Sequence, residues 1–221
     1  MNKEIINSTQ SGRSMIEMLG VLAIVGVLSV GGIAGYSKAM EKFKINKTID
    51  QVSHIATNIR TLYAQQTTYE GLNTKTAYDM KVVPDEWGEP NMDDEYTNEF
   101  NGGVRIVGVT GLPYKVFKIT YFGLQESACI ALATQDWGSG HSSGLISIVI
   151  NGGNLSPDWG EYLDEYGRLN CQGGLYYDNS SAIACPNGAG FSIPMPVATA
   201  AQVCKNCNES QFGCGITLHF Q

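Results

Sequence analysis

A long apolar run near the start of this chain, with a single carboxylate immediately before it, limits the folds that the chain can adopt. From Met18 to Tyr36, 19 residues pass without an Asp, Glu, Lys or Arg, and Glu17 precedes them directly. A helix of that length would span roughly 28 Å, close to the ~30 Å hydrocarbon core of a bilayer. A charge at the bilayer centre costs about 2.5–3.5 kcal/mol, so such a carboxylate is expected to have a partner. The run predicts a membrane helix, with Glu17 either marking its boundary among the headgroups or paired for a function.

The helix is expected to continue beyond the apolar run. From Met40 to Leu62, apolar residues recur mostly every three or four positions, which is typical of a helix with one apolar face. No Pro occurs before Pro84. We therefore predict one helix from about Arg13 to Ala64, apolar all round in its first half and on one face in its second. A membrane anchor followed by a plain stalk helix is the alternative.

Composition describes the rest of the chain. The 221 residues are 43% hydrophobic and 16% charged, so the part beyond the run has enough apolar residues for a core. A net charge of −7 excludes a general attraction to nucleic acid. An even number of cysteines, all beyond the run, predicts up to three disulfides in an oxidising compartment. Six cysteines allow 15 pairings, and spacing leaves the choice open. They are Cys129, Cys171, Cys185, Cys204, Cys207 and Cys214.

The residues after the helix predict an antiparallel sheet. A polar, turn-rich stretch from 67 to 103 is expected to be a surface loop with one short helix. Short runs rich in β-branched and aromatic residues follow, separated by Gly, Pro or Ser, and these predict strands. The runs are 104–109, 115–122, 128–134, 144–150 and 215–220. A long helix followed by an antiparallel sheet is an α+β fold.

The start of the chain carries a specific pattern. A short polar leader ending in Gly12, Glu17 five residues later and the long apolar helix together resemble the class III signal of type IV pilins. The resemblance implies that a prepilin peptidase cuts after Gly12 and that Arg13, where the family usually has Phe or Met, becomes the N-methylated first residue. It also implies that Glu17 pairs with the terminal amine of a neighbouring subunit. An ammonium and a carboxylate that are each costly in lipid become tolerable as a pair.

For the whole chain, the resemblance implies a pilin fold. Residues 1–12 would be the cleaved leader, 13–64 the long helix, with 13–36 in the membrane or the filament core, and 65–221 the extracellular head. The implied partners are further copies of the chain in a helical filament, the prepilin peptidase, the pilus assembly machinery of the inner membrane, and that membrane before assembly. The filament is expected at the cell surface. No enzyme activity, cofactor or metal is expected.

Three glycines within the apolar run suggest a weak point in the helix. Gly31 and Gly35 form a G-x-x-x-G pattern that permits close approach of helices, and Gly32 lies between them. Each Gly costs roughly 0.5–1 kcal/mol of helix stability relative to Ala. Because type IV pilins commonly loosen this stretch, we expect the helix to unwind at Gly31 and Gly32 in the assembled filament.

A second resemblance, to type IVb pilins, lies in the later part of the chain. It is carried by Cys129-Ile130-Ala131-Leu132 after a strand ending Ile119-Thr120-Tyr121, and by the small-residue stretch that leads to Cys204 and a terminal Ile-Thr-x-x-Phe strand. The resemblance implies a Cys129–Cys204 disulfide, with Cys207 as the rival partner. The simplest remaining pairs are Cys171–Cys185 and Cys207–Cys214. Residues 151–203 match no pattern, and the loops in this segment are expected to carry the species-specific surface.

Other motifs point to rival functions. Gly140-His141-Ser142-Ser143-Gly144 fits G-x-S-x-G, but a nucleophile elbow opens a helix, whereas a strand-like run follows here. A rival from another class is therefore a signal-anchored extracytoplasmic hydrolase using Ser142. Cys204 and Cys207 form one C-x-x-C without a second, which disfavours zinc. Within the filament class, a minor pilin or a type II secretion pseudopilin is the alternative to a major subunit.

Overall fold

The computed structural model describes residues 15–109, 115–137, 144–152, 181–184, 194–208 and 213–221. Its helices are α1 (Met15–Leu62), α2 (Thr74–Asp79), α3 (Glu126–Thr134) and α4 (Val197–Cys204), with 3-10 turns η1 (Asp85–Trp87) and η4 (Lys205–Asn208). Its strands are β1 (Tyr96–Thr97), β2 (Gly103–Val109), β3 (Val116–Leu124), β4 (Leu145–Gly152), β5 (Ser181–Ala184) and β6 (Cys214–Phe220). The chain divides into two compact units, 1–43 and 44–221, and the division falls within α1.

Helix α1 is one continuous helix of 48 residues, as its apolar pattern predicted. We call residues 15–43 of α1 its apolar half and residues 44–62 its packed half. The helix passes Gly31 and Gly32 without a break in this single chain, so unwinding in an assembled filament stays a prediction. The packed half buries one face at spacings of three and four, and Val52, Ile55 and Ile59 of the predicted apolar stripe lie on it, whereas Leu62 is exposed. The buried residues of the packed half are Thr48, Gln51, Val52, Ile55, Ala56 and Ile59.

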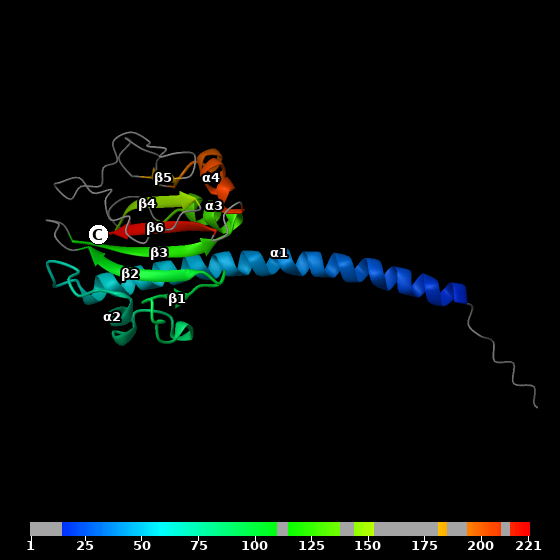
Figure 1. Ribbon diagram of the computed structural model, residues 1–221, viewed down its shortest axis with the longest axis horizontal. Coiled ribbons are helices and arrows are strands. Elements are labelled where there is room, and N and C mark those ends of the chain that lie inside the picture. Colours follow the sequence, from blue (N-terminus) through cyan, green and yellow to red (C-terminus); the bar gives the residue numbers. More distant parts are fainter. Residues whose placement is uncertain (1–14, 110–114, 138–143, 153–180, 185–193, 209–212) are drawn as a thin grey trace, which may run out of the picture. The chain divides into compact units, whose positions relative to one another are not determined.

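The described strands form one six-stranded sheet in the order β1-β2-β3-β6-β4-β5, and each neighbouring pair is antiparallel. The last strand of the chain, β6, lies inside the sheet between β3 and β4 (Figure 1). Leu218 of β6 faces Ile119 of β3 on one side and Ile148 of β4 on the other. The prediction of a long helix followed by an antiparallel sheet is confirmed. The last strand of the chain joins the two parts of the sheet, because it is hydrogen-bonded to β3 on one side and to β4 on the other.

The core of the second unit joins the packed half of α1 to the sheet. Ile55 and Ile59 of α1 are fully buried and belong to the same apolar cluster as Ile106 of β2. Strand β2 alternates buried and half-buried residues, as a strand with one covered face must. Aromatic rings extend the cluster, since Phe117 lies 4.8 Å from Tyr69 and 5.3 Å from Phe220, measured between ring centroids.

The predicted strand at 128–134 is wrong, because this segment is helix α3. Its buried residues are Ala128, Cys129, Leu132 and Ala133, which recur with a helical and not an alternating period. Ala is the strongest helix former, and Glu126 in the first turn favours a helix start. A short apolar run does not by itself distinguish a buried strand from a buried helix.

The stretch from 67 to 103 is only partly a surface loop. It contains α2, η1 and β1, and it buries Tyr69, Leu72, Val82 and Tyr96 in the core. The Tyr96 hydroxyl donates to the backbone oxygen of Thr74 at 2.7 Å. Single apolar residues among polar ones give no periodic signal, so the sequence pattern missed their burial.

The start of α2 also covers the outer edge of β2. The Thr74 hydroxyl accepts from the backbone N–H of Ile106 at 3.2 Å, and the N–H of Gly108 donates to the backbone oxygen of Leu72 at 2.8 Å. Gly108 makes this approach possible, since a Cβ there would lie 2.0 Å from the backbone oxygen of Tyr69. An edge covered in this way no longer offers unpaired backbone groups to another chain.

Candidate functional site

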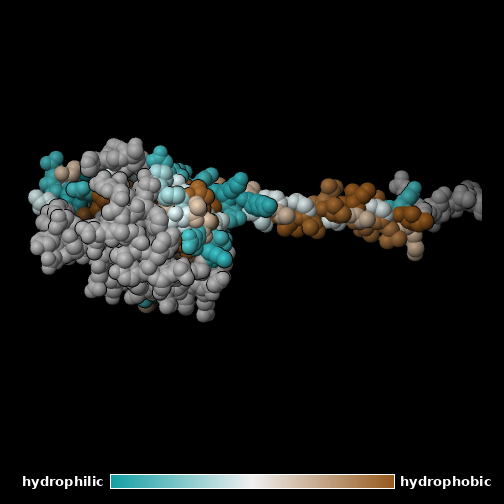
Figure 2. Space-filling model, turned by 90° about the horizontal axis from the view of Figure 1, so that it is seen from above, coloured by the Kyte–Doolittle hydropathy of each residue, from teal (hydrophilic) through white to brown (hydrophobic). Residues whose placement is uncertain are grey.

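The apolar half of α1 exposes its whole circumference. Every residue from Met15 to Ala39 is exposed, and Leu22, Ile24 and Leu28 are 63–68% accessible. Figure 2 shows one face of this surface, which is mostly hydrophobic with pale patches between the hydrophobic ones. By length and composition the helix is suited to cross a membrane. Apolar surface of this extent marks a membrane or protein contact, because isolated soluble proteins rarely leave it open.

Glu17 is the only acidic residue in the first turn of α1, and it is exposed. A carboxylate at this end of a helix interacts favourably with the helix dipole, by about 0.3–1 kcal/mol at an exposed site. The next charged side chain along the chain is Lys38, 21 positions later. Among the described residues, Glu17 is therefore an isolated charge on an apolar surface. The implied cleavage site, Gly12 and Arg13, lies outside the described residues. The terminal amine that would pair with Glu17 belongs to Arg13 of a neighbouring subunit and is therefore not described either.

Polar side chains within the apolar half are satisfied by the helix itself. The Ser29 hydroxyl donates to the backbone oxygen of Val25 at 2.7 Å, and the Ser37 hydroxyl donates to that of Ile33 at 3.0 Å. Both bonds reach the carbonyl four residues earlier, where a serine hydroxyl in a helix finds an acceptor. The position of these serines within a predicted helix was a usable sequence signal for both bonds. Neither hydroxyl then needs a partner from lipid or from another chain.

Gly31, Gly32 and Gly35, three of the five glycines of the apolar half, meet nothing within their own chain. A Cβ built at Gly31, Gly32 or Gly35 would have no heavy atom within 4 Å beyond the adjacent helix backbone. The fold of the single chain does not require glycine at these positions. A close approach by another helix would require it, since small residues let helix backbones come near each other.

A polar collar, formed by Lys47, Gln51, Glu86 and Glu99, lies where the packed half of α1 begins to be buried. Lys47 Nζ lies 2.9 Å from Glu99 Oε1 and 3.4 Å from Glu86 Oε1. The Gln51 amide donates to the same two oxygens at 3.2 and 3.4 Å. The hydrogen bond to Glu99 raises the pKa of Lys47, and a bond to its own backbone is the main cause that lowers the pKa of Glu86. No sequence signal predicted the collar, because its members come from segments far apart in the chain.

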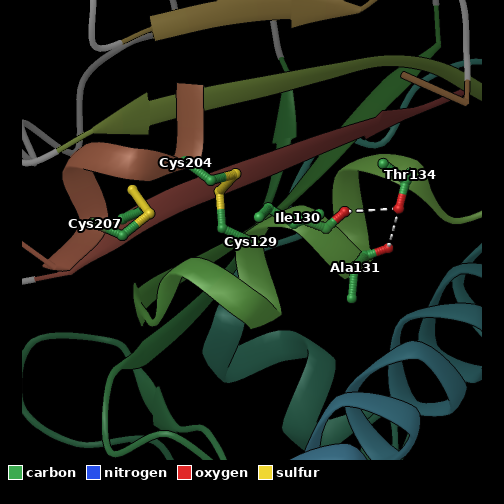
Figure 3. Close-up of a disulfide and its surroundings, with 7 residues drawn as sticks. Cys129, Ile130, Ala131, Thr134, Cys204 and Cys207 are labelled. Atoms are coloured by element: carbon green, nitrogen blue, oxygen red, sulfur yellow. Dashed lines mark hydrogen bonds between the residues drawn. A yellow bond between two sulfur atoms is a disulfide. The ribbon is translucent and has the colours of Figure 1, made fainter. Parts of the chain in front are cut away.

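Two disulfides lie side by side where α3, α4, η4 and β6 meet (Figure 3). Cys129 of α3 is bonded to Cys204 at the end of α4, with 5.8 Å between their Cα atoms. Cys207 of η4 is bonded to Cys214 at the start of β6, with 4.7 Å between their Cα atoms. The first pairing is the one implied by the type IVb resemblance, and the second is one of the two simplest remaining pairs. The third, Cys171–Cys185, lies outside the described residues.

Comparison with known proteins assigns the chain to a family. The Bundlin family model matches residues 37–169, which is more than half of the chain. The chain belongs to the bundlin family. It is 27% identical over 156 residues to the major structural subunit of bundle-forming pilus from Escherichia coli O127:H6 (strain E2348/69 / EPEC), covering 71% of this chain and 79% of the relative. The same identity and coverage hold for the subunit of that name from Escherichia coli O111:H-.

Among solved structures, a crystal structure of a type IV b pilin from Salmonella typhi is similar to this chain, with a TM-score of 0.45 and 16% sequence identity, covering 80% of this chain and 97% of that one. This bundlin-family chain is a type IV pilin by its sequence relatives and by its long helix, antiparallel sheet and C-terminal disulfide. Its family consists of structural pilus subunits.

The described part of this bundlin-family chain contains neither a serine hydrolase site nor a zinc site. Gly144 leads into strand β4 and not into a helix, unlike the turn of a nucleophile elbow, and Ser142 lies outside the described residues. His54 is exposed and bonded to Asn58 at 3.3 Å, whereas His219 is buried and bonded to Ser147 at 3.0 Å. The described zinc-spaced cysteines are consumed in disulfides, so none of them offers a thiolate ligand.

Proposed function

We propose that this bundlin-family chain is a structural subunit of a type IV pilus that polymerises through the apolar half of α1. One observation carries the proposal: a helix whose whole circumference is apolar and exposed, with one carboxylate in its first turn. Lipid covers this surface before assembly, and the same half of neighbouring copies covers it afterwards. The protein performs no catalysis, and its role is to build the filament.

The chain is made as a prepilin and processed at its start. Residues 1–12 form the leader, a prepilin peptidase cuts after Gly12, and Arg13 becomes the N-methylated end of the mature subunit. Residues 13–36 then anchor the subunit in the inner membrane, while 65–221 form the head outside it. The assembly machinery of that membrane transfers the subunit into a filament at the cell surface.

Glu17 gives each incoming subunit its register. In lipid, its carboxylate and a neighbour's terminal ammonium are each costly to bury, whereas the pair is far less so. A subunit that moves by one helical turn leaves both charges unpaired, so the pair selects one axial position. The glycines at 31, 32 and 35 allow the helices to pack closely once that position is reached, and the helix loosens at Gly31 and Gly32 in the filament.

The test compares two variants, each of which lacks one carboxylate. Glu17→Ala is expected to abolish filaments sheared from producing cells, as judged by electron microscopy and by the amount of subunit in the sheared fraction. Glu70→Ala removes another exposed carboxylate, this one from the head, and is expected to leave filament yield unchanged. Non-reducing mass mapping of the Cys129–Cys204 bond in both variants checks that the head has folded.

Filaments of normal yield and shape from Glu17→Ala would refute the pairing, whatever the control does. The mature end is tested separately by sequencing subunits recovered from filaments, which should begin at a methylated Arg13. Ser142→Ala tests the hydrolase alternative. Its filaments should be normal, and a serine-directed covalent probe should label neither the parent protein nor the variant.

A further inference from the structure

The four described cysteines form one buried cluster, although they are joined as two separate disulfides. The sulfur atoms of Cys129, Cys204 and Cys207 all lie within 4.8 Å of one another. All three residues are at most 3% exposed. Figure 3 shows Cys207, which is bonded to Cys214, beside the Cys129–Cys204 bond, and Cys207 comes from the turn that directly follows α4. Cys207 is thus next to a disulfide to which it does not belong.

We propose that the Cys207–Cys214 disulfide is a guard for the Cys129–Cys204 disulfide. By binding the sulfur of Cys207, it prevents that sulfur from attacking its neighbour, and so it preserves the pairing that ties α3 to α4. The guard controls which cysteines are joined, in addition to any stability that its own bond contributes. This role concerns the folded head and does not depend on the proposed role in the filament.

The reaction that the guard prevents is an internal thiol–disulfide exchange. A free Cys207 loses its proton and attacks the sulfur of Cys204, a Cys204–Cys207 bond forms, and the Cys129–Cys204 bond breaks. Cys129 leaves as a thiolate and takes up a proton. Attack on Cys129 instead forms Cys129–Cys207 and releases Cys204. Each exchange begins and ends with one disulfide and one thiol, so it consumes no oxidant and no reductant.

The geometry makes the first product accessible. Cys204 and Cys207 are three positions apart at the junction of α4 and η4. Residues three apart on a helix have Cβ atoms about 5–6 Å apart, and a disulfide needs about 3.5–4.5 Å, so a shift of about 1–2 Å closes the bond. Cys214 differs, since its sulfur is not one of the three that lie within 4.8 Å of each other. Freeing Cys207 and freeing Cys214 should therefore have different consequences.

The test compares two variants that lose the same bond. In the full-length chain in detergent, Cys214→Ser leaves Cys207 as the new thiol, whereas Cys207→Ser leaves Cys214. Both are incubated without added reductant near pH 8.5, about the ordinary pKa of a thiol, then quenched with acid and labelled with N-ethylmaleimide. Trypsin cuts after Lys118, Arg168 and Lys205, so Cys129, Cys204 and Cys207 fall into three different peptides. Mass spectrometry then reads both the label and the linked peptides.

We expect Cys214→Ser to move its label from Cys207 to Cys129 or Cys204, at least about tenfold more than Cys207→Ser, because only Cys207 is placed to attack. The double variant Cys207→Ser/Cys214→Ser, with neither thiol, should keep the Cys129–Cys204 bond and so show that the fold survives loss of the guard. A label that stays on Cys207 in Cys214→Ser would overturn the proposal. Equal rearrangement in both single variants would also overturn it, because general loosening would then be the cause.

Discussion

From Met15 to Ala39 helix α1 exposes every residue, whereas from Thr48 to Ile59 the same helix buries six. The backbone is equally helical in both halves, and both carry hydroxyls bonded to the carbonyl four residues earlier, such as Ser29 in the apolar half and Thr57 in the packed half. The halves differ in what covers them. The packed half is covered by its own sheet, whereas the proposed function assigns the apolar half to lipid and to other copies of the chain.

If the proposed function holds, stability and assembly are separated along one helix. Substitutions in the packed half should change the unfolding free energy of the head, and substitutions in the apolar half should change filament formation. All three tryptophans, Trp87, Trp137 and Trp159, belong to the head. Tryptophan fluorescence therefore reports unfolding of the head alone, while circular dichroism in detergent also reports the apolar half.

The largest effect is expected from removing the Cys129–Cys204 disulfide of the head. Cys129→Ala/Cys204→Ala opens a loop of 75 residues, and the chain-entropy model assigns such a loop about 4.5 kcal/mol of unfolding free energy. Cys207→Ala/Cys214→Ala opens a loop of 7 residues and is expected to cost about 2.5 kcal/mol in the same model. Urea unfolding followed by tryptophan fluorescence measures both. The helical signal of the apolar half in detergent should not change, and its loss would show that the two regions are not independent.

A matched pair of isoleucines tests the comparison within α1 itself. Ile55 is fully buried, and Ile55→Ala should lower the unfolding free energy of the head by roughly 2–5 kcal/mol through the cavity that it leaves. Ile24 is 63% exposed, so Ile24→Ala should leave head stability within about 0.5 kcal/mol and lower filament yield instead. The same urea unfolding and the same filament shearing assay apply to both variants. If both lowered head stability equally, the separation would be wrong.

Acid should weaken the head and leave the apolar run unaffected. Burial lowers the pKa of His219 to about 4, from 6.5. Between these values the unfolded chain takes up a proton that the folded chain refuses, so stability falls as the pH falls from 6.5 to about 4 and is unaffected by His219 above 6.5. Across this pH range, the uptake of the proton lowers the unfolding free energy of the head by about 3 kcal/mol. Urea unfolding across this range should show the slope in the parent and lack it in His219→Asn, and a slope retained by the variant would assign it to other groups.

Two glycines give the smallest and most contrasting pair. Gly108→Ala places a methyl group 2.0 Å from the backbone oxygen of Tyr69, and the forced shift should cost about 1–3 kcal/mol of head stability. Gly32→Ala meets nothing in its own chain and should raise the helicity of the apolar half in detergent, by roughly 0.5–1 kcal/mol of helix propensity. Filaments with normal packing from Gly32→Ala would show that no neighbouring helix needs the space.

Periodic features of the chain were predictable from sequence, and irregular ones were not. The long helix, its change from apolar all round to apolar on one face, and strand β2 each repeat a pattern over several turns or residues. Helix α3 was mistaken for a strand because nine residues, most of them apolar, do not distinguish the two periods. Tyr69 and Tyr96 were placed in a surface loop because single apolar residues carry no period at all.

The linear order of residues by itself determined the apolar run, the place of Glu17 before it and the confinement of the cysteines to the later part of the chain, because each of these is a local pattern. The tertiary structure decided that β6 lies between β3 and β4, that Lys47 contacts Glu86 and Glu99, and that the sulfur of Cys207 lies beside the Cys129–Cys204 bond. Most of these contacts join segments that are separated by tens of residues. The position of Cys207 depends on how closely α3 and α4 pack. All of these contacts depend on how the chain packs, and no local preference encodes them.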